Sequence, residues 1–101
     1  MDTLLVCSNS TRNYLGDYKN VKVVSSAPQL DILNEVDSAD NVVAIGGGAV
    51  IDTAKIISKN PIVCYPTTAA GSSATSWSVY WDGNKKLSIK RLMPDKVIFK
   101  K

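Results

Sequence analysis

Residues 41–58 read NVVAIGGGAVIDTAKIIS, and this stretch decides the fold. The run that ends at Ile45 is apolar without polar alternation, as in strands that are buried on both faces of a parallel sheet. The glycines at 46–48 stop that strand abruptly, and apolar side chains then recur at helical spacing. The stretch therefore predicts a strand that turns directly into an amphipathic helix over residues 49–58.

The same alternation of apolar runs and helical patterns continues on both sides of that stretch. Further strands are expected at 3–7, 21–24 and 61–65, and helices over two turns before Gly16 and from Pro28, with Leu30, Leu33 and Val36 on one apolar face. Parallel strands need crossover connections, and the helices in those connections cover the sheet. The sequence therefore predicts an α/β fold: an open, mainly parallel, Rossmann-like sheet with helices on both faces.

The composition changes after Pro66. Residues 67–76 are small and polar, which is typical of a loop. Strands are expected at 77–81 and 87–92 on either side of the turn Asp82-Gly83-Asn84, with a short last strand at 96–99. We expect this C-terminal β-hairpin at the edge or mouth of the sheet, within a single domain that spans residues 1–101.

The composition limits both the fold and the chemistry. With 101 residues, 45% hydrophobic and 21% charged, the chain is expected to form one globular domain. It shows no run long enough for a membrane-spanning helix and no signal-peptide pattern, so we expect a cytoplasmic protein. Cys7 and Cys64 lie in apolar runs, which is typical of buried thiols. The absence of histidine excludes catalytic triads that use histidine and metal sites that use imidazole.

The net charge of +3 is unevenly distributed. Residues 85–101 contain seven basic side chains and one acidic one, whereas the first 84 residues contain five basic and eight acidic ones. Such a segment is suited to a polyanion, either nucleic acid or the phosphates of a cofactor. Lysines along a sheet edge also discourage pairing with other chains, and this second interpretation is favoured over nucleic-acid binding.

The glycine turn is the first candidate site. Backbone N–H groups at a helix start attract anions, and the absence of Cβ atoms lets a phosphate approach them closely. The spacing is not G-x-G-x-x-G, so that dinucleotide fingerprint is absent. A tight turn without a ligand is the alternative, but three glycines cost more conformational entropy than such a turn needs. Asp52 is expected to support the helix start rather than to act as an acid or base, and Lys55 to pair with it or to face solvent.

A second candidate site follows the strand at 61–65. Residues 66–73, PTTAAGSS, place hydroxyls and small side chains beyond a strand end, where ligands of open parallel sheets collect. Such a stretch is suited to ribose, phosphate or carboxamide groups and leaves room for a flat ring. Taken alone, it would more simply be a surface loop.

Together, residues 46–55 and 66–75 resemble two motifs of the iron-containing (group III) alcohol dehydrogenases, a family related to dehydroquinate synthase and glycerol dehydrogenase. The family's GGGSxxDxAK motif is nearly intact here, with Ala49 in place of the serine. Its PTTAGTGSE motif is one residue shorter here, with Ser73 where the family often has glutamate. The resemblance is specific over residues 41–99 and topological before them.

The resemblance implies a site for NAD or NADP. In the family, the glycine motif holds the pyrophosphate through backbone N–H groups, the threonines contact the adenosine side, and a lysine reaches a ribose. The residues that match are Gly46, Gly47, Gly48, Ala49, Asp52, Thr67, Thr68, Ser72 and Lys86. Ser25 and Ser26 stand where an acid often selects NAD through the ribose 2′-hydroxyl, so NADP is as admissible as NAD.

The resemblance also implies limits. The family's chains are several times longer, and an aspartate and histidines of a second, helical domain bind the metal. This chain has no histidine, so we expect no metal, no catalytic residue and no autonomous alcohol oxidation. We expect a truncated, stand-alone domain that binds a nucleotide. The alternatives are an interaction protein that retains the fold and one half of a split dehydrogenase. In each case we expect a homo-oligomer, or a partner that covers the inter-domain face.

Overall fold

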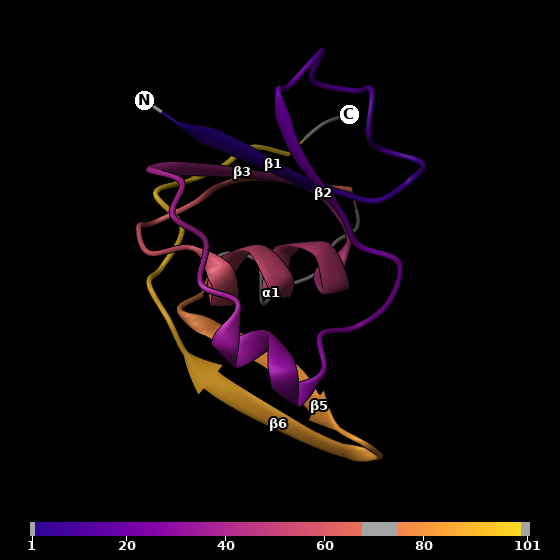
Figure 1. Cartoon of the computed structure of the whole chain (residues 1–101), viewed down its shortest axis with the longest axis vertical. Helices are drawn as coiled ribbons and strands as arrows, with labels where there is room; N and C mark the ends of the chain where they lie inside the picture. The colour runs from indigo at the N-terminus through magenta and orange to yellow at the C-terminus, as the bar shows by residue number, and fades with distance from the viewer. Residues whose placement is uncertain (1, 68–74, 100–101) are drawn as a thin grey trace.

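The computed structural model describes residues 2–67 and 75–99. In chain order the elements are β1 (Thr3–Cys7), β2 (Asn20–Val23), the 3-10 helix η1 (Leu30–Asn34), β3 (Asn41–Gly46), α1 (Gly48–Ile57), β4 (Val63–Pro66), β5 (Trp77–Asp82), β6 (Lys85–Lys90) and β7 (Lys96–Val97). Figure 1 shows α1 between the large sheet and the hairpin of β5 and β6. Apart from η1 and the segment after β1, the helix and strand limits differ from the expected ones by at most two residues.

The large sheet is parallel throughout, in the order β2-β1-β3-β4-β7. The α/β class, the parallel sheet and the C-terminal hairpin predicted from the sequence are thus confirmed. The strand order reverses between β1 and β3, because the chain leaves β1 toward β2 but leaves β3 toward β4. In open parallel sheets, ligands bind beyond the carboxyl ends of the strands at such a reversal.

The hairpin lies neither at the edge nor at the mouth of the large sheet, which corrects the expectation. β5 and β6 pair along their whole length and form a separate antiparallel sheet. This small sheet packs on the side of α1 that faces away from the large sheet (Figure 1). The Trp81 N–H donates to the Pro28 carbonyl oxygen at 2.8 Å, which ties β5 to the segment before η1. The hairpin therefore covers the helix and does not extend the sheet.

The face of the large sheet opposite α1 is covered without a helix. Residues 9–15 form turns where a two-turn helix was expected, and Leu15 and Tyr18 pack against the buried Leu5. The hydroxyl groups in this segment bond to one another and to nearby backbone, which competes with helix formation. Gly16, at φ +88°, then turns the chain toward β2. In the described part of the chain, α1 and η1 both lie on one face of the sheet, so helical cover of both faces is not found.

The second expected helix is shortened to the single 3-10 segment η1. Gln29 is extended and forms a parallel bridge with Trp81 of the hairpin, so a helix cannot begin at Pro28. The expected apolar face is also displaced, because Leu30 is exposed whereas Ile32 is buried. A helix of five residues is too short for the 3.6-residue period of an apolar face to repeat. Which side chains of η1 are buried is therefore decided by the hairpin that covers them.

All side chains of helix α1 from Val50 to Ile57 are buried. The helix therefore has no solvent-facing side over these residues, contrary to the prediction of an amphipathic helix. Lys55 is only 2% exposed, which rules out the solvent-facing alternative for this side chain. At the end of the helix, the Arg91 guanidinium donates to the carbonyl oxygens of Lys55 and Ser58 at 3.4 and 3.3 Å. A cation at this position also complements the negative end of the helix dipole.

Ser78 of β5 is a buried side chain that the fold does not need as a polar group. It is fully buried, and its hydroxyl has no hydrogen-bond partner among the described residues. Because an unpaired buried hydroxyl costs desolvation, Ser78→Ala is expected to raise the free energy of unfolding by about 1 kcal/mol. Urea unfolding followed by circular dichroism measures this free energy. The control is Ser88→Ala, because Ser88 of β6 is exposed. A loss of stability in Ser78→Ala would mean that the hydroxyl is bonded in solution.

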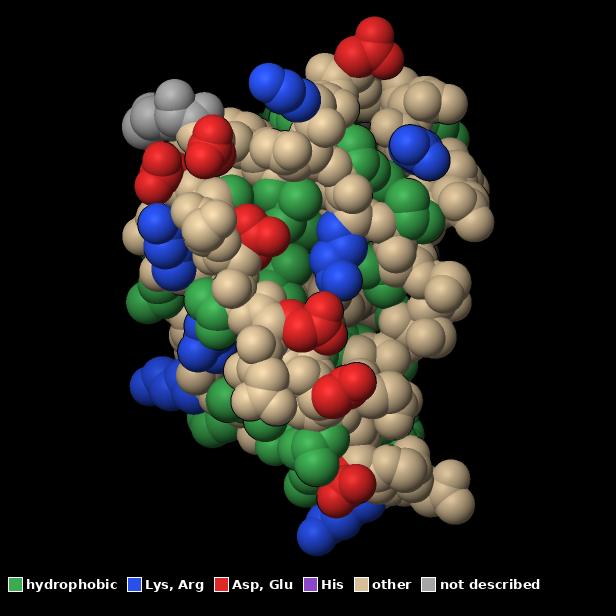
Figure 2. Space-filling view, viewed as in Figure 1, with side chains coloured by type: hydrophobic (Ala, Val, Ile, Leu, Met, Phe, Trp, Pro, Cys, Tyr) green, Lys and Arg blue, Asp and Glu red, His purple; other side chains and the backbone are tan. Residues whose placement is uncertain are grey.

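The surface carries mixed charges. Figure 2 shows acidic and basic side chains interspersed over the face it presents, without a single basic patch. Lys96 lies on the edge strand β7, as expected for lysines that protect a sheet edge, whereas Lys100 and Lys101 lie outside the described residues. Cys7 and Cys64 are buried, as predicted, and form no disulfide, and burial raises the pKa of both thiols. Within residues 2–67 and 75–99, no helix has the length and apolarity to cross a membrane.

Candidate functional site

The two sequence motifs meet beyond the carboxyl end of β3, next to the reversal of strand order. Gly46 ends β3 and pairs with Pro66 of β4. The Thr67 N–H donates to the Gly46 carbonyl oxygen at 3.0 Å, so the glycine turn and the start of the second motif are joined by backbone. Thr68 and Ser72, the other candidates from this motif, lie outside the described residues. The structure therefore brings Thr67 to the glycine turn.

Gly46 is required by the backbone itself. Its φ of +155° is one that residues with a side chain rarely adopt, and a Cβ there would lie 2.7 Å from Cγ2 of Val50. The close approach lets the first turn of α1 pack directly on the end of β3. This glycine therefore sets the geometry of the turn.

The start of α1 presents backbone donors. Gly47 is the residue before the helix, and the first helical hydrogen bond runs from the Ile51 N–H to the Gly47 carbonyl oxygen at 3.1 Å. The N–H groups of Gly48, Ala49 and Val50 consequently have no partner within the helix. A Cβ built at Gly48 would meet none of the described residues within 4 Å. Among residues 2–67 and 75–99, the turn thus has room for an anion next to N–H groups that have no partner within the helix, which is the arrangement that binds phosphate groups.

Thr11 also belongs to this region, although the sequence predicted only a helix of two turns in this segment. Its hydroxyl donates to the Ile45 carbonyl oxygen at 2.8 Å and accepts the Ser8 N–H at 3.0 Å. The loop after β1 is thereby fixed against the residue that precedes Gly46. The short S-x-x-T spacing is a local signal for this turn, but its contact with Ile45 depends on the pairing of β1 with β3.

Asp52 and Lys86 lie on the hairpin side of α1. The Asp52 carboxylate accepts a hydrogen bond from the Val79 N–H of β5, as expected for a supporting residue. Burial raises the pKa of Asp52, and the charges of Lys55 and Lys86 with the Val79 bond partly offset that rise. Lys86 is exposed on β6, opposite Trp81 of β5. The structure therefore brings Asp52 and Lys86 close to each other.

Lys55 is the second buried charge of α1. Its ammonium donates to the Trp77 carbonyl oxygen at 3.2 Å, at the first residue of β5. Burial lowers the pKa of Lys55, and the nearby Asp52 and Cys64 partly oppose this by favouring the charged form. The side chain is therefore an ammonium with a backbone partner, held where an apolar residue would usually stand.

The free energy of unfolding is expected to depend on the titration of Lys55 at alkaline pH. Between the lowered pKa of the folded state and 10.5, the unfolded chain holds a proton that the folded chain has released. The free energy of unfolding therefore gains a contribution that rises with pH in this window, at most about 1.4 kcal/mol per pH unit. Lys55→Met should remove that contribution. Urea unfolding of both proteins from pH 7 to 10.5 gives the difference, in which the thiol of Cys7 largely cancels. The thiol of Cys64 contributes to the difference, because the charge of Lys55 lowers its pKa.

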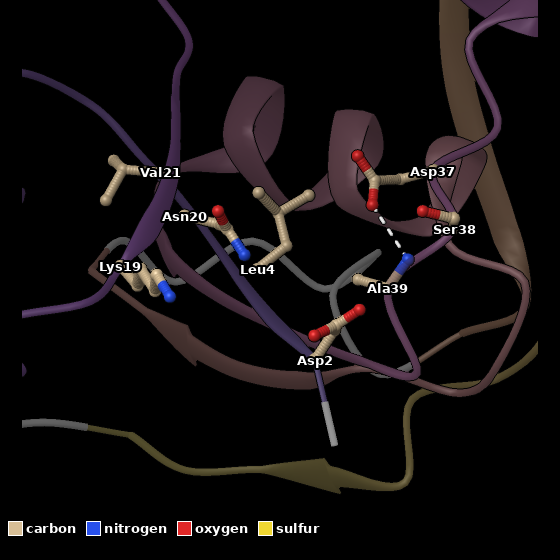
Figure 3. Close-up of a pocket in the computed structure, with 8 residues that line it drawn as sticks. All are labelled: Asp2, Leu4, Lys19, Asn20, Val21, Asp37, Ser38 and Ala39. Atoms are coloured by element: carbon tan, nitrogen blue, oxygen red, sulfur yellow. Dashed lines mark hydrogen bonds between the residues drawn. The ribbon is translucent and has the colours of Figure 1, made fainter.

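Two of the hollows in the described structure lie at opposite ends of the large sheet. One of about 210 Å³ lies beyond the carboxyl end of β2 and is lined by Ser25 and Ser26, together with Lys22 and Thr53. The other, of about 450 Å³, lies at the amino ends of β1 and β2, the opposite end of the sheet. Figure 3 shows the second hollow, where Asp37 accepts the Ala39 N–H at 2.8 Å. The first hollow is at the same end of the sheet as the glycine turn.

The described side chains do not provide the ligands that hold the metal in the family that the sequence resembles. Within residues 2–67 and 75–99, no three side chains of histidine, cysteine, aspartate or glutamate gather as metal ligands, and the chain has no histidine. A catalytic zinc or iron needs about three such ligands. The described residues therefore do not supply a metal site of that kind.

The comparison with known families decides the affiliation. The sequence model described as iron-containing alcohol dehydrogenase matches residues 29–101. The chain belongs to the iron-containing alcohol dehydrogenase family. Within this family, it is 44% identical over 66 residues to a maleylacetate reductase from Pseudomonas knackmussii, covering 60% of this chain and 19% of that protein. Maleylacetate reductase 1 from Cupriavidus pinatubonensis is 41% identical over 71 residues, covering 65% and 20%.

Solved structures of iron-containing alcohol dehydrogenases share the fold. An iron-containing alcohol dehydrogenase from Corynebacterium glutamicum superposes with a TM-score of 0.82 at 22% identity, over 98% of this chain and 33% of that one. Maleylacetate reductase from a Rhizobium species gives a TM-score of 0.76 at 21% identity, over 96% and 33%. The chain thus spans about a fifth of the length of the curated relatives and a third of these structures.

Proposed function

We propose that this chain is the NAD(P)-binding portion of an iron-containing alcohol dehydrogenase-type enzyme, with the cofactor pyrophosphate at the N-terminus of α1. The observation that carries the proposal is the turn at Gly48, where N–H groups without a partner inside the helix border space that no described residue fills, at the reversal of strand order. Anionic ligands in open parallel sheets bind at this place. The two relatives named maleylacetate reductases make reduction of maleylacetate the candidate activity of the complete enzyme.

The residues proposed to hold the cofactor divide by role. The N–H groups of Gly47, Gly48 and Ala49 bind the pyrophosphate, with Gly46 shaping the turn and Asp52 supporting the helix from the hairpin side. Thr67, with Thr68 and Ser72 after it, is proposed for the adenosine side, and Lys86 for a ribose. The hollow beside Ser25 and Ser26 is lined by hydroxyls, by Lys22 and by the carboxylate of Asp31. Because it holds a cation as well as an acid, we propose that it suits NADP as well as NAD. When bound, the nicotinamide ring supplies the hydride acceptor or donor.

Titration with ADP, NAD and NADP tests the proposal. The probe is the amide spectrum of the isotopically labelled chain, in which the signals of Gly47, Gly48 and Ala49 are expected to shift most. Inorganic phosphate at equal ionic strength is the control for unspecific anion binding. If none of the nucleotides shifts these amides at millimolar concentration while the fold is intact, the chain is instead an interaction protein that retains the fold.

We also propose that the chain associates with itself or with a partner. The observation in favour is a group of exposed apolar side chains on both sides of the edge strand β7, namely Leu92, Met93, Ile98 and Phe99. Exposed apolar side chains that gather into a patch mark interaction sites in soluble proteins, and we propose that these four form one. Sedimentation velocity at increasing concentration should show a second, faster species, and Phe99→Ser should reduce it. A single monomeric species at high concentration would reject self-association.

A further inference from the structure

The outer edge of β5 is held by side chains of α1. In an antiparallel pair, the backbone groups of alternate residues point away from the partner strand. On β5, the outward carbonyl oxygen of Trp77 accepts the Lys55 ammonium at 3.2 Å. Two residues on, the outward N–H of Val79 donates to the Asp52 carboxylate. One donor and one acceptor from a single helix thus take the place of a neighbouring strand.

The same alternation of outward-pointing backbone groups continues along β5 to Trp81. Its N–H also points away from β6 and donates to the Pro28 carbonyl oxygen at 2.8 Å. The outward groups of three alternate residues are therefore satisfied in turn by an ammonium, a carboxylate and a carbonyl. Only the last of these is backbone, and it lies outside α1. The helix contributes its two contacts through side chains one turn apart.

Stability alone does not account for these two charges. Asp52 and Lys55 are 8% and 2% exposed, and burial opposes the charged form of both. Replacing a buried charged pair by well-packed apolar residues is often neutral or stabilising. What apolar residues cannot do is hold one carbonyl and one N–H of β5 in a fixed register. The pair is therefore suited to positioning the hairpin on the helix.

The register matters because the hairpin carries a candidate ligand residue. Lys86 lies on β6 opposite Trp81, and its charge is close enough to Asp52 to lower the pKa of that carboxyl group. We propose that Asp52 and Lys55 are positioning residues that fix the hairpin, and with it Lys86, relative to the N-terminus of α1. This inference rests on the proposed function for its consequence in binding. The contacts of β5 stand without it.

Amide hydrogen exchange of the ligand-free chain tests the hairpin contacts. In Asp52→Leu the Val79 amide loses its acceptor, and its exchange is expected to accelerate about tenfold or more. Asp52→Asn keeps an acceptor oxygen and should restore slow exchange. The Trp81 amide, whose acceptor is Pro28, is the internal reference. Unchanged exchange of Val79 in Asp52→Leu would overturn the assignment.

Binding of ADP and NADP tests the consequence. Lys55→Met replaces the ammonium by an apolar chain of similar length, and its dissociation constant for NADP is expected to rise about tenfold. ADP lacks the nicotinamide ribose, so its affinity should change less. The matched control is Lys59→Met, just after α1, where the lysine is exposed and pairs with Asp40. The exchange of the β5 amides is measured in Lys55→Met as well, so this variant carries the comparison even where Asp52→Leu does not fold.

The outcomes separate the two proposals. If the unsubstituted chain binds neither nucleotide, the proposed function fails, while the exchange experiment still decides on the hairpin contacts. If both nucleotides bind and Lys55→Met loosens the hairpin without weakening NADP, the positioning role is overturned. Accelerated exchange in the hairpin together with weaker NADP binding, and no change in Lys59→Met, supports it.

Discussion

Replacing Gly46 by alanine is expected to lower the free energy of unfolding by about 2–4 kcal/mol. Two costs add at this position. The backbone at φ +155° is strained for any residue with a side chain, and the new Cβ would lie 2.7 and 2.9 Å from Cγ2 and Cβ of Val50. Urea unfolding followed by circular dichroism measures the change. A free energy of unfolding equal to that of the unsubstituted chain would show that the turn relaxes easily.

The matched control is alanine at Gly48. There the Cβ would meet none of the described residues within 4 Å, and no positive φ is involved. Alanine also favours the helix by about 0.5–1 kcal/mol over glycine, so Gly48→Ala should leave stability unchanged or raise it. In Gly46→Ala, the additional change Val50→Ala removes both Cγ atoms but keeps Cβ, and should restore only part of the loss. Two glycines separated by one residue thus have opposite expected effects.

Glutamate at Gly48 is expected to abolish nucleotide binding while the fold is kept. The side chain would occupy the open space beside the first N–H groups of α1, and its negative charge would repel a phosphate. Loss of a charge-assisted contact of this kind predicts a dissociation constant for ADP about 100-fold higher. The free energy of unfolding should change by less than about 1 kcal/mol, because an acid at a helix start is favourable. Calorimetric titration with ADP and urea unfolding measure the two effects.

Glutamine at Gly48 separates the two causes. It has the size of glutamate without the charge, so its dissociation constant should lie between those of Gly48→Glu and the unsubstituted chain. Wild-type affinity in Gly48→Glu, with the fold intact, would place the phosphate elsewhere and contradict the proposed site. Equal loss in both variants would mean that space, and not charge, governs binding at this turn.

Local patterns were sufficient to predict the parallel sheet and the glycine turn. The apolar runs that became β1, β3 and β4 pair in parallel, and the glycines at 46–48 lie between β3 and α1 as expected. A buried parallel strand needs an apolar run, and an abrupt strand-to-helix turn needs glycine, so both leave a mark in a few adjacent residues. The candidate pyrophosphate site is predicted from the same local pattern of an apolar run followed by glycines.

The position of the hairpin could not be predicted in this way. Its strands and its turn are local, but its place on the outer side of α1 depends on contacts such as that of Lys55 with Trp77, 22 residues away. The burial of Asp52 and Lys55 could not be predicted for the same reason. It depends on these long-range contacts, whereas charged residues on a helix usually face water. The shortened η1 has the same cause, because the bridge from Gln29 to Trp81 extends the chain where a helix was expected.

The enclosure of α1 has a consequence for how this chain can vary. A helix on the outside of a domain has one side on which substitutions cost little, and sequence drift accumulates there. Residues 50–57 have no such side, because the large sheet and the hairpin cover the helix between them. Saturation mutagenesis should find residues 50–57 of this helix intolerant, including the two charged ones, whereas Gly48 at its start accepts substitution. Most of the chain's freedom to diverge is then left to its turns and exposed strand faces.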